Sequence, residues 1–241
     1  MKFKDLVKEV RQDVPKCPEE VVVRALRDAT RRLMVRAENF VEEVTLDMVK
    51  EQAEYDVPLE GDLEGYSIIQ TQRVRAAGRL LNPVSRDMLD RFYLGSRQNL
   101  EVRGSYAVRT TKGTPPIGSG IQSWEELPSG QPQHYMMPRQ DKIVLVPKPD
   151  KSEEGGLDLE VALKPTRKSS SIPEWYADHY EETIIIGARA SLLNTSHVDW
   201  ADPQRGQMYA QMFQVEVERA REEHRRGHTY QASVLRVRPY Y

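Results

Sequence analysis

The stretch Leu157-Asp-Leu-Glu-Val-Ala-Leu-Lys-Pro165 decides the architecture of the middle of the chain. Apolar residues occupy positions 157, 159, 161 and 163, and acids occupy positions 158 and 160. Since successive side chains of a β-strand point to opposite faces, this alternation predicts a strand with one buried face. Residues 142–146 are predicted to form a second strand, in a hairpin with residues 134–137.

The segment upstream of this hairpin is predicted to be mostly β as well. Residues 66–74, 100–104 and 106–108 have strand-like composition. One helix is expected among them, over residues 85–94, with Ser85 as its N-cap. The middle of the chain is therefore predicted to be mostly antiparallel β with one helix.

The two ends of the chain have a helical period instead. Near the N-terminus, apolar residues recur at i, i+4, i+7 and i+11: Val22, Leu26, Ala29 and Leu33. This spacing predicts an amphipathic helix over residues 18–38, in a region that we expect to be helical to about residue 50. Near the C-terminus, residues 175–193 are predicted to form one helix. Asp202 and Pro203 open another, which Gly227 ends.

These patterns predict an α+β fold. Helices from the N- and C-terminal parts of the chain form a bundle, and a mostly antiparallel β domain is inserted between them. The expected divisions are N-terminal bundle helices over 1–54, the inserted β domain with one helix over 55–170, C-terminal bundle helices over 171–227 and an extended C-terminal arm over 228–241.

Composition excludes several classes of protein. The chain has 241 residues, a net charge of −2 and a single cysteine, Cys17. One cysteine rules out an intrachain disulfide framework and a zinc site built from several cysteines. No apolar run approaches the ~20 residues of a membrane helix, and we expect no secretory signal, because residues 1–6 lack an apolar core. A net charge near zero argues against a general nucleic-acid coat protein.

Charge is concentrated in two blocks. Residues 42–64 contain nine acids and one base, Lys50, and residues 219–238 contain six arginines and two acids. Two interpretations stay open: solvated faces, or surfaces that meet partners of opposite sign, including a neighbouring copy. The candidate residues for a contact with such a partner or between subunits are Glu51, Glu54, Asp56, Arg221 and Arg225.

Signals for catalysis are weak, and we expect no catalytic residue, cofactor or metal site. Metal-dependent nucleases combine acids with a nearby lysine, which here would be Asp150, Asp158, Glu160 and Lys164. Lys164 lies four residues after Glu160, one ~6.8 Å step too far along a strand. His224 and His228 have metal-ligand spacing, but Gly227 lies between them.

Several short motifs, taken in order, resemble the head-to-tail adaptor family of tailed bacteriophages. They are Cys17-Pro-Glu-Glu20, Arg24-Ala-Leu-Arg-Asp-Ala29, Ala162-Leu-Lys-Pro-Thr166, Ile172-Pro-Glu-Trp175, Gly187-Ala-Arg-Ala190, Trp200-Ala-Asp-Pro203, Met212-Phe213 and Leu235-Arg-Val-Arg-Pro239. They cover nearly the whole chain, and residues 78–135 match least.

The resemblance implies a structural virion protein of the neck. Such adaptors form a ring, usually of twelve copies, under the portal protein and above a downstream neck or tail protein. Double-stranded DNA passes through without sequence-specific binding, and neither a cofactor nor a membrane is involved. The resemblance therefore makes the DNA channel a second candidate location for the charged residues named above. Two alternatives stay open: another neck or tail-completion component, and a metal-dependent nuclease.

The C-terminal arm is the predicted portal contact, and a disordered tail is the alternative. Tyrosine and arginine are the residues that anchor protein interfaces, and the arm ends in two of each. The predicted portal-interface residues are Leu235, Arg236, Val237, Arg238, Pro239, Tyr240 and Tyr241.

Overall fold

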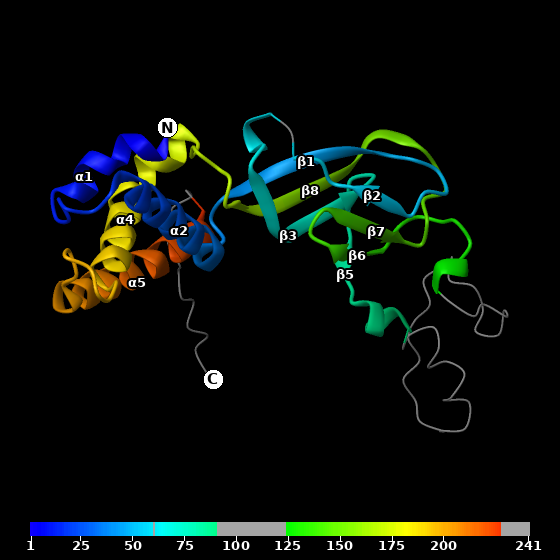
Figure 1. The fold of residues 1–241 in the computed structure, drawn as a ribbon. Coiled ribbons are helices and arrows are strands. Elements are labelled where there is room, and N and C mark those ends of the chain that lie inside the picture. Colours follow the sequence, from blue (N-terminus) through cyan, green and yellow to red (C-terminus); the bar gives the residue numbers. More distant parts are fainter. Residues whose placement is uncertain (60, 91–123, 228–241) are drawn as a thin grey trace, which may run out of the picture. The chain divides into compact units, whose positions relative to one another are not determined.

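A computed structural model describes residues 1–59, 61–90 and 124–227 of the chain. The chain divides into two compact units (Figure 1). The helical unit consists of Met1–Phe40 and the chain from Leu163 onward, and the β unit consists of Val41–Ala162. The chain leaves the helical unit once and returns to it once, so the β unit is an insertion. The predicted α+β class is confirmed.

The helical unit contains three long helices and a short N-terminal segment. Its elements are η1 (Phe3–Leu6), α1 (Val7–Arg11), α2 (Glu19–Ala37), α4 (Glu174–Leu193) and α5 (Pro203–Arg226). The predicted apolar face of α2 is buried, with Val22, Leu26, Ala29 and Leu33 fully covered. Helix α4 packs against both α2 and α5, and it departs from helical geometry at Tyr180.

Local capping chemistry sets the ends of α5. The carboxylate of Asp202 accepts a hydrogen bond from the backbone N–H of Arg205 at 3.1 Å, and Pro203 occupies the first turn. Gly227 follows the last turn with a φ of 62°, in the region that favours glycine. Both predicted boundaries of this helix are confirmed.

Gly187 allows the three long helices to approach closely. A Cβ added at this position would lie 2.6 Å from Cε2 of Phe213 on α5 and 3.0 Å from Cβ of Ala29 on α2. Both distances are shorter than van der Waals contact, so only glycine fits at this crossing.

Asp13, in the segment between α1 and α2, links the short N-terminal segment to two long helices. One carboxylate oxygen lies 2.9 Å from Nε of Arg189 on α4, and the other is paired with Arg205 on α5. Arg189 also donates a hydrogen bond to the carbonyl of Glu9 at 2.8 Å. Both Gly187 and Arg189 of the motif at residues 187–190 therefore have packing roles.

The β unit holds two four-stranded sheets, in the orders β1-β8-β3-β4 and β2-β7-β6-β5. The strands are β1 (Val41–Met48), β2 (Glu54–Asp56), β3 (Tyr66–Ala76), β4 (Arg79–Leu80), β5 (Asn82–Pro83), β6 (His134–Arg139), β7 (Lys142–Val146) and β8 (Glu153–Pro165), with short 3-10 turns η2 (Gly61–Leu63) and η4 (Trp124–Glu126). The short β5 pairs with β6 in parallel, and the other pairings with a determined register are antiparallel.

The predicted central strands are confirmed. In β8 the residues Leu157, Leu159, Val161 and Leu163 are fully buried, and the hairpin of β6 with β7 turns at residues 140–141. Ser85 accepts a hydrogen bond from the backbone N–H of Met88 at 3.2 Å and caps a helical stretch that is described to residue 90. The remainder of that predicted helix and the strands at 100–104 and 106–108 lie outside the described residues.

The expectation of helix to about residue 50, within N-terminal bundle helices over 1–54, is wrong. Helix α2 ends at Ala37, and residues 41–48 form β1, which pairs with β8 from Val41 opposite Ala162 to Met48 opposite Glu153. Along β1, Glu43, Thr45 and Asp47 are exposed and the residues between them are more covered. The strand forms because β8 supplies its hydrogen-bond partners from more than a hundred residues away.

Candidate functional site

The predicted acidic residues Glu54 and Asp56 share the exposed face of β2. They flank Tyr55, whose side chain is buried on the opposite face of the strand. The register with β7 places Lys142 opposite Asp56, and Nζ of Lys142 lies 2.5 Å from Glu54 and 3.4 Å from Asp56. Two carboxylates and one ammonium leave this exposed cluster with a net charge of −1.

The lysine of this cluster is held in its charged form. The hydrogen bond that Lys142 donates to Glu54, followed by the negative charges of Asp56 and Glu54, raises the pKa of Lys142 above its usual value. The local field is therefore less negative than the sequence block of nine acids suggests. Sequence reasoning missed this compensation because Lys142 is far from the block in the chain.

The hydroxyl of Tyr55 organises the turn that carries Glu51. It accepts a hydrogen bond from the N–H of Val49 at 3.1 Å and lies 3.0 Å and 2.9 Å from the carbonyl oxygens of Val49 and Gln52. Glu51 has a positive φ of 65°, and its N–H donates to the carbonyl of Pro149 at 2.8 Å. The third predicted acid thus stands on a fixed turn rather than on the strand.

The predicted basic residues lie in the other unit, near the end of α5. Arg225 is 3.7 Å from Glu222, and the neighbouring Arg219 is 3.2 Å from Glu223. Arg221 is half-buried. The acids and bases singled out from the sequence therefore belong to different units, and the arginines 219 and 225 have acidic partners on their own helix. The predicted portal-interface residues, 235–241, lie outside the described part of the chain.

Three residues of the nuclease alternative, Asp158, Glu160 and Lys164, lie on the outward face of β8, and the fourth, Asp150, precedes the strand. Asp158 accepts a hydrogen bond from the hydroxyl of Thr45 at 3.1 Å, and Glu160 forms an ion pair with Arg73 at 2.9 Å. Both acids alternate with buried apolar residues, as predicted. Within residues 1–59, 61–90 and 124–227, no group of three histidine, cysteine, aspartate or glutamate side chains is arranged to hold a metal ion.

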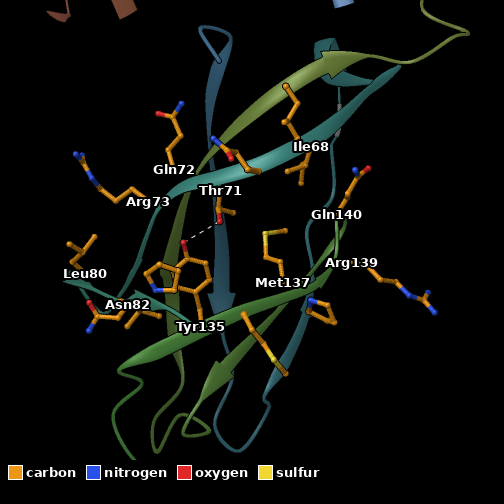
Figure 2. Close-up of a pocket in the computed structure, with 16 residues that line it drawn as sticks. Ile68, Thr71, Gln72, Arg73, Leu80, Asn82, Tyr135, Met137, Arg139 and Gln140 are labelled. Carbon is orange, nitrogen blue, oxygen red and sulfur yellow. Dashed lines mark hydrogen bonds between the residues drawn. The ribbon is translucent and has the colours of Figure 1, made fainter. Parts of the chain in front are cut away.

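A groove between β3 and β6 was not predicted from the sequence (Figure 2). Its volume is about 610 Å³, and its floor includes a hydrogen bond of 3.2 Å from the hydroxyl of Thr71 to that of Tyr135. The lining mixes apolar residues such as Ile68 and Met137 with the polar residues Gln72 and Asn82. The groove forms where two different sheets meet, so no local sequence pattern predicts it. The apolar run Met136-Met137-Pro138 is the nearest local signal.

None of the helices in the described ranges has the length and apolar character that crossing a bilayer requires. A comparison with models of protein families matches residues 1–238 to the family described as SU10 adaptor protein. A comparison with curated proteins finds no match.

Proposed function

Because the chain belongs to the SU10 adaptor protein family, a family of bacteriophage structural proteins that connect head and tail, we propose that it forms a ring of twelve copies beneath the portal. In this proposal the ring joins the portal to the next neck or tail protein and surrounds the path of double-stranded DNA. The observation that carries the proposal is the family match, which spans residues 1–238 of 241.

The proposed portal contact is the C-terminal arm, residues 235–241. Helix α5 ends at Arg226 and is followed by Gly227, which leaves fourteen residues beyond it. Tyr240 and Tyr241 supply rigid amphipathic area, and Arg236 and Arg238 supply forked hydrogen-bond donors. An arm that orders on binding loses conformational entropy but wraps its partner, in the manner of strand addition.

The proposed role of Glu51, Glu54 and Asp56 is to face either the DNA channel or the basic helix of an adjacent copy, near Arg221 and Arg225. What supports a channel role is their exposure and the residual negative charge of the cluster with Lys142. A lumen that paired with many phosphates would hold DNA in place, whereas a weakly negative one lets it slide.

We further propose that the chain acts without catalysis or a cofactor. The family is a structural one, and the acids considered for metal chemistry are engaged by Thr45 and Arg73. A Mg²⁺-dependent nuclease would lose its activity in Asp158→Ala. Turnover of DNA by the wild type that disappears in this variant would replace the structural proposal with an enzymatic one.

Electron microscopy of the protein alone and mixed with the portal of its phage tests the ring. We expect a ring coaxial with the portal, and loss of attachment when the chain is truncated after Gly227. A wild-type protein that stays a compact monomer beside the portal contradicts the adaptor role. A truncated protein that still attaches contradicts only the role of the arm.

A further inference from the structure

Helix α5 has two apolar faces, and only one of them is used inside the helical unit. Phe213 and Val217 are buried, on the side where α5 packs against α4 and α2 (Figure 1). Met208, Met212 and Val215 are 49%, 43% and 66% exposed. Their spacing of four and three residues places them on one stripe, roughly opposite Phe213 on the helix. We call these three residues the outer stripe.

The helix segment that carries the outer stripe contains no charged residue. Residues 206–215 contain no lysine, arginine, aspartate or glutamate, although 30% of the chain is charged. The exposed residues there are Gln207, Met208, Gln211, Met212, Gln214 and Val215. By contrast, helix α2 exposes Glu20, Arg24, Asp28 and Arg36 at comparable positions. A solvated helix face is normally charged, whereas the centre of a protein interface is depleted of charge and enriched in methionine.

The same unit offers a counter-surface of suitable chemistry. In its described part, the other large apolar side chains that are exposed are Val35 and Trp175. Trp175, 55% exposed in the first turn of α4, contacts Phe40 and Tyr176 with ring centroids 5.7 Å and 5.5 Å away. Tryptophan anchored in this way is the residue type that most often dominates an interface.

Charge around the two surfaces is complementary. The outer stripe is bracketed on its own face by Arg205, three residues before Met208, and Arg219, four residues after Val215. Arg205 pairs with Asp13, and Arg219 pairs with Glu216 and Glu223, but the two arginine side chains stay 45% and 69% exposed. The exposed residues next to Trp175 on α4 are the acids Glu174, Asp178 and Glu182 and the histidine His179, which lies 3.5 Å from Glu223 on α5. Burial and the neighbouring charges of Glu9 and Asp178 raise the pKa of Glu181 above its usual value, as expected in an acid-rich patch. We call Glu174, Trp175, Asp178 and Glu182 the Trp175 face.

We propose that the outer stripe of α5 binds the Trp175 face of a second copy of this chain. The inference rests on the proposed ring and names the surfaces that hold neighbouring copies together. The contact joins two different surfaces, so it is heterologous, and repetition around a closed rotation produces a ring rather than a dimer. At the centre of the contact, the outer stripe packs against Trp175 of the neighbouring copy. At its rim, Arg205 and Arg219 approach the acids of the Trp175 face.

Cross-linking with engineered cysteines tests the pairing directly. The native Cys17 is 1% exposed and does not compete for the reagent. A double variant, Met212→Cys with Asp178→Cys, is assembled on the portal and treated with a short bismaleimide. Asp178 is used because Trp175 contacts core aromatic side chains. We expect a ladder of covalent oligomers from the double variant and monomers from each single variant.

The outcomes separate this inference from the proposed function. A ring that is visible by microscopy but yields no ladder overturns the pairing and leaves the adaptor role intact. Dimers from Met212→Cys alone indicate a self-complementary contact and also overturn it. Absence of any ring on the portal refutes the proposed function and the inference together.

A charge introduced into the outer stripe provides a second measurement. Met212→Glu should weaken association of copies by at least about 100-fold, because an unpaired carboxylate would be buried at the contact. The matched control is Leu80→Glu, at a leucine 63% exposed in the β unit, which should leave association unchanged. Circular dichroism verifies that both variants fold. Met212→Glu rings that form normally overturn the inference. Loss of portal binding by single copies of Met212→Glu would assign the stripe to the portal and overturn it as well.

Discussion

Replacing Gly187 with alanine tests whether the helical unit is held together by the close crossing of α4 with α5 and α2. The added methyl group would lie 2.6 Å and 2.8 Å from two atoms of the Phe213 ring and 3.0 Å from Cβ of Ala29. Phe213 is 4% exposed and Ala29 is fully buried, so neither neighbour can swing into solvent. Relief requires the helices to move apart.

Two effects of opposite sign set the magnitude. Overpacking a core costs about 1–3 kcal/mol, and alanine is favoured over glycine inside a helix by about 1 kcal/mol. Because the methyl group meets two helices at once, the upper end of the packing cost applies, and we expect a net loss of about 2 kcal/mol. In a chain of this size that loss lowers the melting temperature by about 4–8 °C.

Urea unfolding followed by helical circular dichroism measures this loss, since the long helices belong to the helical unit. The variant Phe213→Leu, which shortens the obstructing side chain, provides a double-mutant cycle. In that background the alanine should cost at least about 1 kcal/mol less than in the wild type. A Gly187→Ala protein as stable as the wild type, or more so, would refute the claim that the crossing has no room for a methyl group.

Three further substitutions test other parts of the structure. Tyr55→Phe should lower the free energy of unfolding by about 1–2 kcal/mol, because backbone groups of Val49 lose their hydrogen-bond partner. Faster proteolytic cleavage within the turn at 49–53 would report this loss, and an unchanged cleavage rate would contradict it. Asp13→Asn should lower the free energy of unfolding, measured in urea, by about 1–2 kcal/mol. This is less than the loss from breaking a fully buried ion pair, because Asp13 and Arg189 are partly exposed. An unchanged urea midpoint would show that Asp13 does not hold the helices together. Burial raises the pKa of Glu42 above its usual 4.5, so ionised Glu42 destabilises the fold above that pKa and protonation removes the penalty. Glu42→Gln should therefore raise stability at pH 7 and lose this advantage as the pH falls through the raised pKa; an advantage that persists at pH 3 contradicts the explanation.

The ends of the helices could be predicted because their chemistry is local. Asp202, Pro203 and Gly227 sit next to the backbone groups that they cap, so their identities alone place the boundaries of α5. Ser85 is a similar case. The buried face of β8 was equally readable, because a strict alternation leaves no second arrangement of its side chains.

Non-local features could not be read in this way. The acidic composition of strand β1 is also typical of an exposed helix, so composition does not identify it as a strand. Its partner is β8, where residue 162 lies opposite residue 41, and no local pattern predicts that pairing. The ion pairs of Lys142 with Glu54 and Asp56 depend on the register between β2 and β7. The groove between β3 and β6 exists only once two sheets are in place.

Helix α5 illustrates a different limit of sequence periodicity. Its apolar residues fit two stripes, one through Phe213 and Val217 and one through Met208, Met212 and Val215, and spacing alone does not say which faces the core. The structure assigns the first stripe to the interior. The second stripe stays exposed.

The insertion of the β unit has a consequence for how such a protein can change. At the points of departure and return, the N–H of Leu163 donates to the carbonyl of Phe40 at 2.8 Å, and Val41 pairs with Ala162. The points where the chain leaves and re-enters the helical unit are therefore adjacent. A short linker from Phe40 to Leu163 would close the helical unit without stretching it. We therefore expect that the β unit can be exchanged for another domain. Replacing it could give one helical scaffold a new surface while the helices keep their own packing.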